Sequence, residues 1–482
     1  MRIAFVYPDL NFFSSPVKYR GIIALGIGYL SSSLKKAGHQ VSLIHIIDKF
    51  DQEHYLDLLN KAKPQIVAFS SLTHQFNTVK MMAKLVKDNF DVLTICGGVH
   101  PTIAPEESIE VKDLDIICRG EGEEAFVELC NALENKKDIS RIKNLWIKQD
   151  GKIYKNDVRP LEENLDNLPF PDRQIFDYDN MWDGDVRVIQ VLTGRGCPYD
   201  CGYCCNHQYR ALYKGSKYVR FRSPEKVIEE IMEAKKVYKN ARFVNFLDDT
   251  FCLRKEWLEK FLPLYKKEIN LPFHAHTRVE VLDDEVAKLL KDAQLEHISV
   301  GIESGNEELR ERVLNRKMTN QQIAKAFELG RKYGINMSGY NMVGLPFENI
   351  KQVLETIKLN AKVRPHQMNV AIFQPYPHTK LYQLCKENNL LTEKEITSYF
   401  GNSVLTQKSI SNNEVDFTYF YFKPFVQLYK WAYKLGGKTG VLLEKIIDAI
   451  YFQKNLYPFY LSLRPLLKKL KQLKQSKFTA EQ

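Results

Sequence analysis

Cysteine is scarce in this sequence, with 9 among 482 residues, which excludes a small secreted scaffold held together by disulfides. Long apolar runs are also absent. The longest one near the N-terminus, between Arg20 and Lys35, is broken by serines and falls short of the roughly 20 residues that span a membrane. The first apolar segment, residues 3–7, is too short for a signal peptide. These absences predict a cytoplasmic protein with reduced thiols.

Acidic residues are outnumbered, with 59 Asp and Glu against 69 Lys and Arg and a formal net charge of +10. Half of this excess comes from residues 461–482, which hold six Lys or Arg and one Glu. Four leucines of this tail fall on one helical face among lysines: Leu466, Leu467, Leu470 and Leu473. Such a helix suits an anionic membrane surface or the protein's own core. The rest of the chain has no basic face with interleaved aromatics, which argues against nucleic-acid binding.

The order of apolar runs predicts an α/β protein with two parallel sheets. Five strand-like runs alternate with helical patterns over residues 1–140, which is typical of a Rossmann-like domain. Residues 141–185 are expected to form a connector that contains a hairpin around residues 149–151. Six further strand–helix units over 186–395 predict a partial (βα)6 barrel, and residues 396–482 are expected to be helical and basic. Ligands of such sheets bind at the carboxyl ends of the strands.

The most informative segment is Cys197-Pro-Tyr-Asp-Cys201-Gly-Tyr-Cys204, which follows the first strand of the predicted barrel through a glycine-rich loop. Three thiolates this close in sequence can meet one metal centre, and thiolates favour iron–sulfur clusters, zinc or copper(I). Three ligands leave one iron of a cubane cluster open. The alternative is a structural zinc site to which His207 supplies the fourth ligand. The adjacent Cys205 is expected to be a packing residue.

In this position the C-x-x-x-C-x-x-C spacing resembles the signature of radical S-adenosylmethionine (SAM) enzymes. The resemblance implies that Cys197, Cys201 and Cys204 bind three irons of a [4Fe–4S] cluster, and that SAM chelates the fourth. It also implies SAM contacts from side chains near the strand ends, the candidates being Tyr203, Asp248, Asp249, Arg278 and Glu303. Tyr203 matches an aromatic position that commonly lies near the adenine. For the two aspartates the alternative is a helix cap.

Three loops of the N-terminal domain resemble the cobalamin-binding domain that is fused to many radical SAM enzymes. They supply the candidate cobalamin-binding residues Ser70, Ser71, Thr73, Gly97, Gly98, His100, Gly120, Glu121 and Gly122. Each loop follows a strand, where glycine lets a bulky ligand approach the backbone. The D-x-H-x-x-G motif of the cobalamin-dependent mutases is absent, because residues 8–19 contain no His. The resemblance implies that cobalamin lies between the sheet edge and the barrel mouth.

Together these resemblances imply a cobalamin-dependent radical SAM enzyme. They imply that one electron from the cluster cleaves SAM to a deoxyadenosyl radical. This radical would abstract hydrogen from an unactivated carbon of a small-molecule or lipid-like substrate. Methylcobalamin would then methylate this carbon. The expected electron donor is a flavodoxin or ferredoxin. Two alternatives stay open: a cobalamin-dependent cyclase or rearrangement enzyme, similar to the anaerobic Mg-protoporphyrin ester cyclase, and a non-enzymatic iron–sulfur or cobalamin sensor. Peripheral membrane contact through the basic C-terminal helix is a further expectation.

Overall fold

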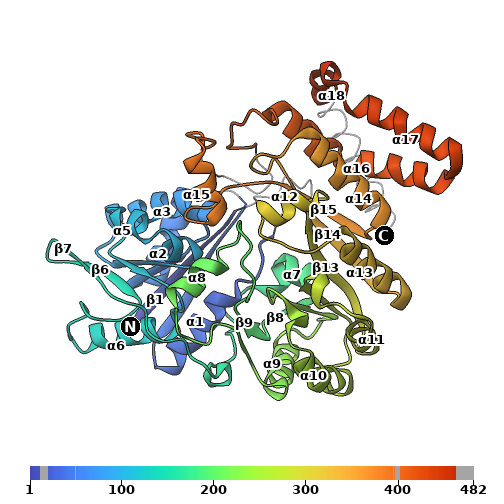
Figure 1. Ribbon diagram of the computed structural model, residues 1–482. Helices are drawn as coiled ribbons and strands as arrows, with labels where there is room; N and C mark the ends of the chain where they lie inside the picture. Colours follow the sequence, from blue (N-terminus) through green and yellow to red (C-terminus); the bar gives the residue numbers. More distant parts are fainter. Residues whose placement is uncertain (11–19, 49, 395, 397–401, 463–482) are drawn as a thin grey trace.

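The structure is a computed structural model that describes residues 1–10, 20–48, 50–394, 396 and 402–462. It contains two large sheets side by side, with a group of helices beyond the second one (Figure 1). A small sheet pairs β9 (Gly194–Arg195) antiparallel with β10 (Arg220–Phe221). The tail helix expected around residues 466–473 lies outside the described residues. Among the described helices, none is both long enough and apolar enough to cross a membrane.

The N-terminal sheet has seven strands in the order β2-β1-β3-β4-β5-β6-β7. The first five pair in parallel, and they are β1 (Arg2–Leu10), β2 (Gln40–Asp48), β3 (Ile66–Ser70), β4 (Leu93–Gly97) and β5 (Ile116–Cys118). Helices α1 (Leu25–Lys36) and α6 (Glu123–Glu134) cover one face, while α2 (Gln52–Ala62) and α3 (Phe76–Asn89) cover the other. Side chains alternate along β1, so that Ile3 and Phe5 enter one core and Ala4 and Val6 enter the other.

The hairpin expected inside the connector belongs to this sheet instead. Strand β6 (Leu145–Gln149) pairs antiparallel with β5, and β7 (Lys152–Lys155) pairs with β6 around the turn at Asp150–Gly151. The reason is burial, because Leu145, Trp146 and Ile147 are each at most 5% exposed. The sheet therefore continues past residue 140, and the segment that links the two sheets begins after β7.

The second sheet has six parallel strands in the order β15-β14-β13-β12-β11-β8, and β8 and β15 stay at its two edges. The strands are β8 (Val188–Val191), β11 (Phe243–Phe246), β12 (Phe273–Thr277), β13 (Leu295–Glu303), β14 (Asn336–Val343) and β15 (Gln367–Ile372). The intervening helices include α9 (Pro224–Val237), α10 (Lys255–Glu268), α11 (Asp284–Asp292), α13 (Asn320–Tyr333) and α14 (Ile350–Val363). The predicted partial (βα)6 barrel is confirmed.

The helices begin where the sequence offers caps. Ser223 accepts a hydrogen bond from the backbone of α9, whose first residue is Pro224. Thr319 and Asn349 open α13 and α14 with reciprocal capping boxes. Because these signals are local, the sequence marks the start of α9, α13 and α14, whereas α10 begins without a side-chain cap.

The C-terminal region is helical, as expected. Helix α16 (Asn412–Leu435) packs on α14 and β15, and α17 (Gly437–Tyr451) returns along α16 before α18 (Tyr457–Ser462). The densely aromatic segment 417–425 lies within α16, where Phe417, Phe422 and Phe425 are buried. The α16–α17 hairpin projects from the barrel at one end of the molecule (Figure 1).

Candidate active site

The cysteine loop leaves β8 at the carboxyl edge of the second sheet. Thr193 and Gly194 are held there by Asp248, whose buried carboxylate accepts hydrogen bonds from both backbone N–H groups and from the Thr193 hydroxyl, at 2.7–3.1 Å. Burial raises the pKa of Asp248 to about 6. Its oxygens are thus directed at the loop that precedes Cys197. Asp248 therefore anchors this loop, a role that the sequence analysis did not foresee, and its contact with SAM stays a prediction.

Each of the three candidate cluster ligands has a hydrogen-bonding neighbour at its sulfur. Cys197 Sγ lies 3.8 Å from Thr250 Oγ1, Cys201 Sγ accepts from Arg278 Nη1 at 3.1 Å, and Cys204 Sγ accepts from Asn206 Nδ2 at 3.5 Å. All three thiols are free. A hydrogen bond from the Cys205 thiol lowers the pKa of Cys204 to about 7. Cys205, expected only to pack, therefore supports the thiolate form of its neighbour.

The donor set fits a cluster better than a single ion. Within the described residues, no three His, Cys, Asp or Glu side chains gather closely enough to share one metal ion, and His207 therefore does not complete a zinc site with the cysteines. Zinc requires all its ligands about 2 Å from one atom, whereas a cubane cluster spreads its thiolate ligands over different irons. The three free thiols of this loop, each with a hydrogen-bonding neighbour at its sulfur, suit a cluster whose thiolate ligands bind different irons.

Glu303 ends β13 in a left-handed backbone conformation, with φ +63°, which is uncommon for a residue other than glycine and typical of functional sites. Its carboxylate lies over Gly301, where a Cβ would overlap it. Tyr203 donates its hydroxyl hydrogen to Glu303 Oε1 at 3.0 Å. Arg316 donates to the Tyr203 hydroxyl at 2.9 Å and to Glu303 Oε1 at 3.3 Å. The structure thus brings two candidate SAM contacts together and adds Arg316, which the sequence analysis missed.

The other two candidates also lie beside the cysteine loop. The Arg278 guanidinium stacks on the Tyr199 ring at 3.7 Å from its centroid, pairs with Glu280 and contacts Cys201. Asp249 accepts from Asn206 at 3.1 Å, and that same amide contacts Cys204. Burial raises the pKa of Glu303 while Arg316 opposes the shift. A ligand at the open side of the loop therefore meets charged groups of both signs.

Most of the candidate cobalamin residues gather at the carboxyl edge of β3 and β4. The two loops interlock, because Ser71 N donates to Gly97 O at 2.9 Å and His100 N donates to Ser71 O at 3.1 Å. Gly98 has φ +102°, and a Cβ there would lie 2.8 Å from Ser71 O, so only glycine fits. Ser70 ends β3 beside Gly97. This edge gives a bulky ligand an approach to bare backbone.

His100 and Thr73 lie at the same edge and contact each other. His100 Nδ1 is 3.4 Å from Thr73 Oγ1, and the imidazole packs on Phe76 with ring centroids 4.0 Å apart. Burial lowers the pKa of His100 to about 4, so the ring is neutral at pH 7.

The third candidate loop instead faces the barrel. The Glu121 carboxylate accepts two hydrogen bonds from Arg220, at 2.5 and 3.1 Å, and pairs with Arg195 at 3.2 Å. Gly120 has φ +76°, and a Cβ there would overlap the Tyr213 hydroxyl. Gly122 lies against Cys118. Glu121 therefore pairs with arginines of the two-stranded β9–β10 sheet, which the sequence did not reveal because these partners lie about 70–100 residues further along the chain. Its contact with cobalamin stays a prediction.

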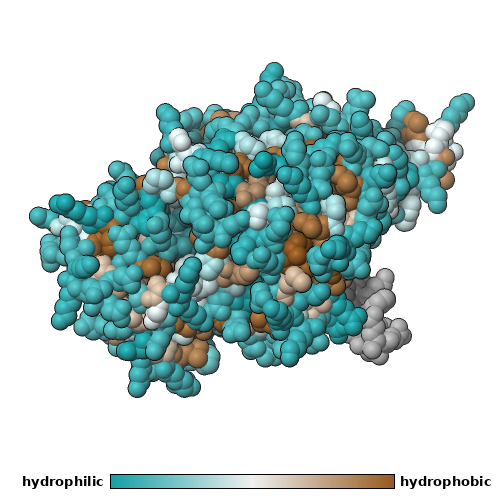
Figure 2. Space-filling model, turned by 90° about the horizontal axis from the view of Figure 1, so that it is seen from below, coloured by the Kyte–Doolittle hydropathy of each residue, from teal (hydrophilic) through white to brown (hydrophobic). Residues whose placement is uncertain are grey.

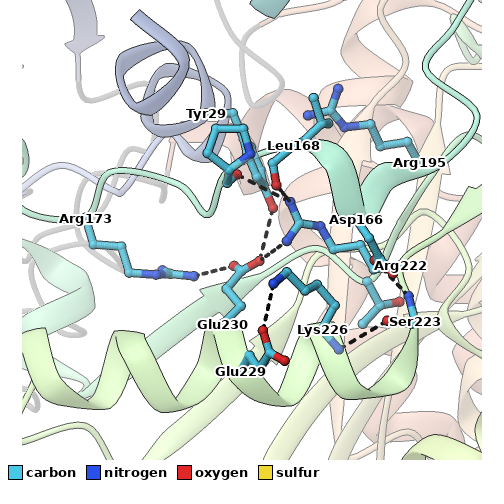
Figure 3. Close-up of polar contacts among 12 residues, drawn as sticks. Tyr29, Asp166, Leu168, Arg173, Arg195, Arg222, Ser223, Lys226, Glu229 and Glu230 are labelled. Carbon is cyan, nitrogen blue, oxygen red and sulfur yellow. Dashed lines mark hydrogen bonds and ion pairs between the residues drawn. The ribbon is translucent and has the colours of Figure 1, made fainter. Parts of the chain in front are cut away.

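A second set of buried charges also joins the two halves of the molecule (Figure 3). Glu230 of α9, 1% exposed, accepts from Arg173 at 2.7 Å and from Arg222 at 3.2 Å. Tyr29 of α1 donates its hydroxyl to the same carboxylate at 3.4 Å, and Arg195 lies over the Tyr29 ring. Because Arg195 precedes Cys197 by two residues, these contacts place the cysteine loop relative to the N-terminal sheet.

Glu348, in the loop after β14, is a buried acid that the sequence analysis did not single out. One of its oxygens accepts from the Gly344 and Leu345 N–H groups at 2.7 and 3.1 Å. Burial raises the pKa of this carboxyl to about 8 from an ordinary 4.5. At pH 7 the folded protein therefore holds a proton on Glu348 that the unfolded chain has released.

This proton makes the stability of the protein depend on pH. Since the folded state binds the extra proton, the free energy of unfolding should fall by on the order of 1 kcal/mol per pH unit as the pH rises from about 4.5 to 8. Glu348→Gln keeps an acceptor for both N–H groups but does not titrate. Denaturant midpoints at about pH 5.5 and 7.5 should show the variant gaining stability relative to the wild type, and a constant difference would contradict the assignment.

Comparisons with known proteins agree with this geometry. Residues 191–359 match the radical SAM superfamily, and residues 21–130 match the B12 binding domain. The chain is 29% identical over 413 residues to the uncharacterized methyltransferase PH0819 of Pyrococcus horikoshii, covering 83% of this chain and 88% of the relative. It is 26% identical over 396 residues to the anaerobic magnesium-protoporphyrin IX monomethyl ester cyclase of Rubrivivax gelatinosus, covering 80% and 70%.

The fold also has a solved counterpart. The cobalamin-dependent SAM radical enzyme OxsB, with aqua-cobalamin bound, superposes with a TM-score of 0.69 at 16% identity, over 93% of this chain and 71% of that one. A Rossmann-like sheet beside a partial barrel with a three-cysteine loop thus defines a radical SAM enzyme with a B12-binding domain. The chain thus carries a radical SAM domain beside a B12-binding domain, and these two domains imply a [4Fe–4S] cluster, SAM and cobalamin as its cofactors.

Proposed function

We propose that this enzyme methylates an unactivated carbon of a small molecule, with SAM as the source of the methyl group and cobalamin as its carrier. The observation that carries the proposal is the contact between the cysteine loop and the N-terminal domain. Arg195, two residues before Cys197, pairs with Glu121 and with Glu123, the latter at 2.6 Å. Methyl transfer between two cofactors requires that they lie close together. The contact joins the loop that would hold the cluster to the loop after β5, which is a candidate cobalamin-binding loop.

The chain's own residues would bind and orient the reactants. Cys197, Cys201 and Cys204 would hold the cluster, which supplies the electron that cleaves SAM. Glu303, fixed by Arg316 and Tyr203, offers a carboxylate for the SAM ammonium, and Asp249 offers another. Arg278 would donate a hydrogen bond to the Cys201 thiolate and partly offset its charge. The loops at Ser70–Thr73 and Gly97–His100 would carry cobalamin.

The radical SAM domain and the methyltransferase relatives imply a small-molecule substrate and a one-electron reductant for this chain. We propose that flavodoxin or ferredoxin supplies the electron and that the enzyme works in the cytoplasm, where thiols stay reduced. All nine cysteines are free, which supports this location. A lipid-like substrate is proposed because α16 places many aromatic side chains next to the barrel.

Metal content and product analysis test this function. Protein purified without oxygen from cobalamin-fed cells should contain about four irons and one cobalt per chain, and with a reductant it should release deoxyadenosine from SAM. A sensor would hold the cofactors but release none. SAM labelled in its methyl group should pass the label to the bound cobalamin. Iron without cobalt, or unlabelled cobalamin, would contradict methyl transfer.

The competing activity is a radical cyclisation or rearrangement. It is favoured by the resemblance to the magnesium-protoporphyrin ester cyclase, which covers 80% of this chain. A cyclase would cleave SAM to deoxyadenosine without moving the SAM methyl group onto cobalamin, so the labelling experiment separates the two activities.

A further inference from the structure

The outer side of the α16–α17 hairpin carries an apolar surface that the fold leaves uncovered. Six large side chains, 40–61% exposed, form this hairpin patch: Trp431, Leu435, Val441, Leu442, Ile446 and Ile450. Figure 2 shows hydrophobic side chains among hydrophilic ones where the hairpin projects from the molecule. Exposed apolar side chains that gather in this way, on a projecting element, mark a contact surface.

The pattern of α17 explains why its outer face stays free. Leu442, Ile446 and Ile450 recur every four residues and so share one face of the helix. Ile447 and Tyr451 each follow one of these residues, about 100° further around the helix. They are 2% and 0% exposed and pack in the core shared with α16. The face with Ile447 and Tyr451 therefore holds α17 against α16, and the face with Leu442, Ile446 and Ile450 does not take part in their shared core. When a helix has two apolar faces and the protein core covers only one, the other face is expected to contact a second apolar partner.

The charged residues around the hairpin patch indicate what kind of partner covers it. Lys434, Lys438 and Lys445 are exposed beside the hairpin patch. The acidic residues of α17, Glu444 and Asp448, both pair with Lys358 of α14 at 2.9 Å and so face the body of the protein. The sequence beyond α18 adds six Lys or Arg and one Glu over residues 463–482. The outer side of the hairpin thus combines apolar and cationic groups.

Two other occupants of the patch are disfavoured by this charge. A second copy of the chain would bring lysines against lysines, and lysine is depleted in the buried centre of protein interfaces. The chain's own tail, with its excess of lysine, would add positive charge to a positive rim. Phosphate headgroups over an apolar interior match both features. We propose that the hairpin patch inserts into the surface of an anionic lipid bilayer while Lys434, Lys438 and Lys445 contact lipid phosphates.

Sedimentation with vesicles tests the proposal, with the full-length holoprotein and phosphatidylcholine vesicles that contain or lack phosphatidylglycerol. The protein should bind the anionic vesicles, and Leu442→Ser with Ile446→Ser should weaken the partition coefficient on the order of tenfold. Met81→Ser with Met232→Ser is the matched control, because both methionines are 44% exposed on other helices, and it should change nothing. Replacing the three lysines by Gln should cost about fivefold for each lysine at low salt.

Three results would overturn the proposal. The first is that the wild type and the Leu442→Ser, Ile446→Ser variant have equal partition coefficients. If deletion of residues 463–482 then abolishes binding, the tail and not the hairpin patch binds the vesicles. The second is a dimer without vesicles that this variant dissociates, since a second copy then covers the patch. The third is stronger binding after the tail is deleted, since the tail then covers it. Iron content and circular dichroism should match the wild type in every variant, because exposed side chains contribute little to the fold.

Discussion

Cys201→Ala is expected to reduce bound iron from about four atoms per chain to near zero and to abolish the release of deoxyadenosine from SAM. The three candidate ligands lie on one loop that Asp248 ties to β8 through Thr193 and Gly194, and a cluster bound through only two thiolates has an exposed, labile edge. Loss of Cys201 also removes the sulfur that accepts a hydrogen bond from Arg278 Nη1 at 3.1 Å, while Arg278 keeps its pairing with Glu280. Iron analysis and the visible absorption of anaerobically purified protein measure the effect.

Cys205→Ser provides the matched control in the same loop. Serine keeps a hydroxyl that donates to the Cys204 sulfur, as the Cys205 thiol does in the wild type, so this variant should retain its iron. Cys385→Ala removes a buried thiol that packs in a separate apolar cluster, and it should also retain its iron. Iron that survives in Cys201→Ala but is lost in Cys205→Ser would move the ligand assignment to Cys205, and zinc in place of iron would make the loop a structural site.

Glu230→Ala is expected to lower the free energy of unfolding by about 3–5 kcal/mol, because it leaves the Arg173 and Arg222 guanidinium groups buried without their shared carboxylate. Both arginines are at most 5% exposed, and Tyr29 loses the acceptor of its hydroxyl. Urea denaturation followed by tryptophan fluorescence measures the loss.

The control for Glu230 is an exposed pair on the same helix. Glu233 pairs with Lys236 at the surface, with side chains 55% and 69% exposed, so Glu233→Ala should cost less than about 1 kcal/mol. Because Tyr29 and Glu230 link α1 to α9, the Glu230→Ala variant should also show faster proteolysis between residues 156 and 187, in the segment that joins the two sheets. A loss no larger than that of Glu233→Ala would show that these buried charges do not hold the two halves together.

The sequence determined the order of the elements and placed three candidate metal ligands on one loop, because both depend on residues close together in the chain. The spacing of Cys197, Cys201 and Cys204 fixes three thiols on one loop, and the alternation of apolar runs fixes two parallel sheets with helices between their strands. The glycines at 97 and 98 likewise lie where a strand ends, since Gly97 is the last residue of β4 and Gly98 follows it. The helix caps at Ser223, Thr319 and Asn349 are equally local.

Only the tertiary structure decided which charged groups meet. Arg316 reaches Tyr203 across 113 residues, Arg220 reaches Glu121 across 99, and Tyr29 reaches Glu230 across 201. It directed Asp248 to the loop before Cys197, paired Glu121 with Arg220, and joined the hairpin at residues 145–155 to the first sheet. The physical reason is that burying a charged group is costly unless it is paired. Its partner can come from any part of the chain that folding brings near, so the local sequence does not identify it.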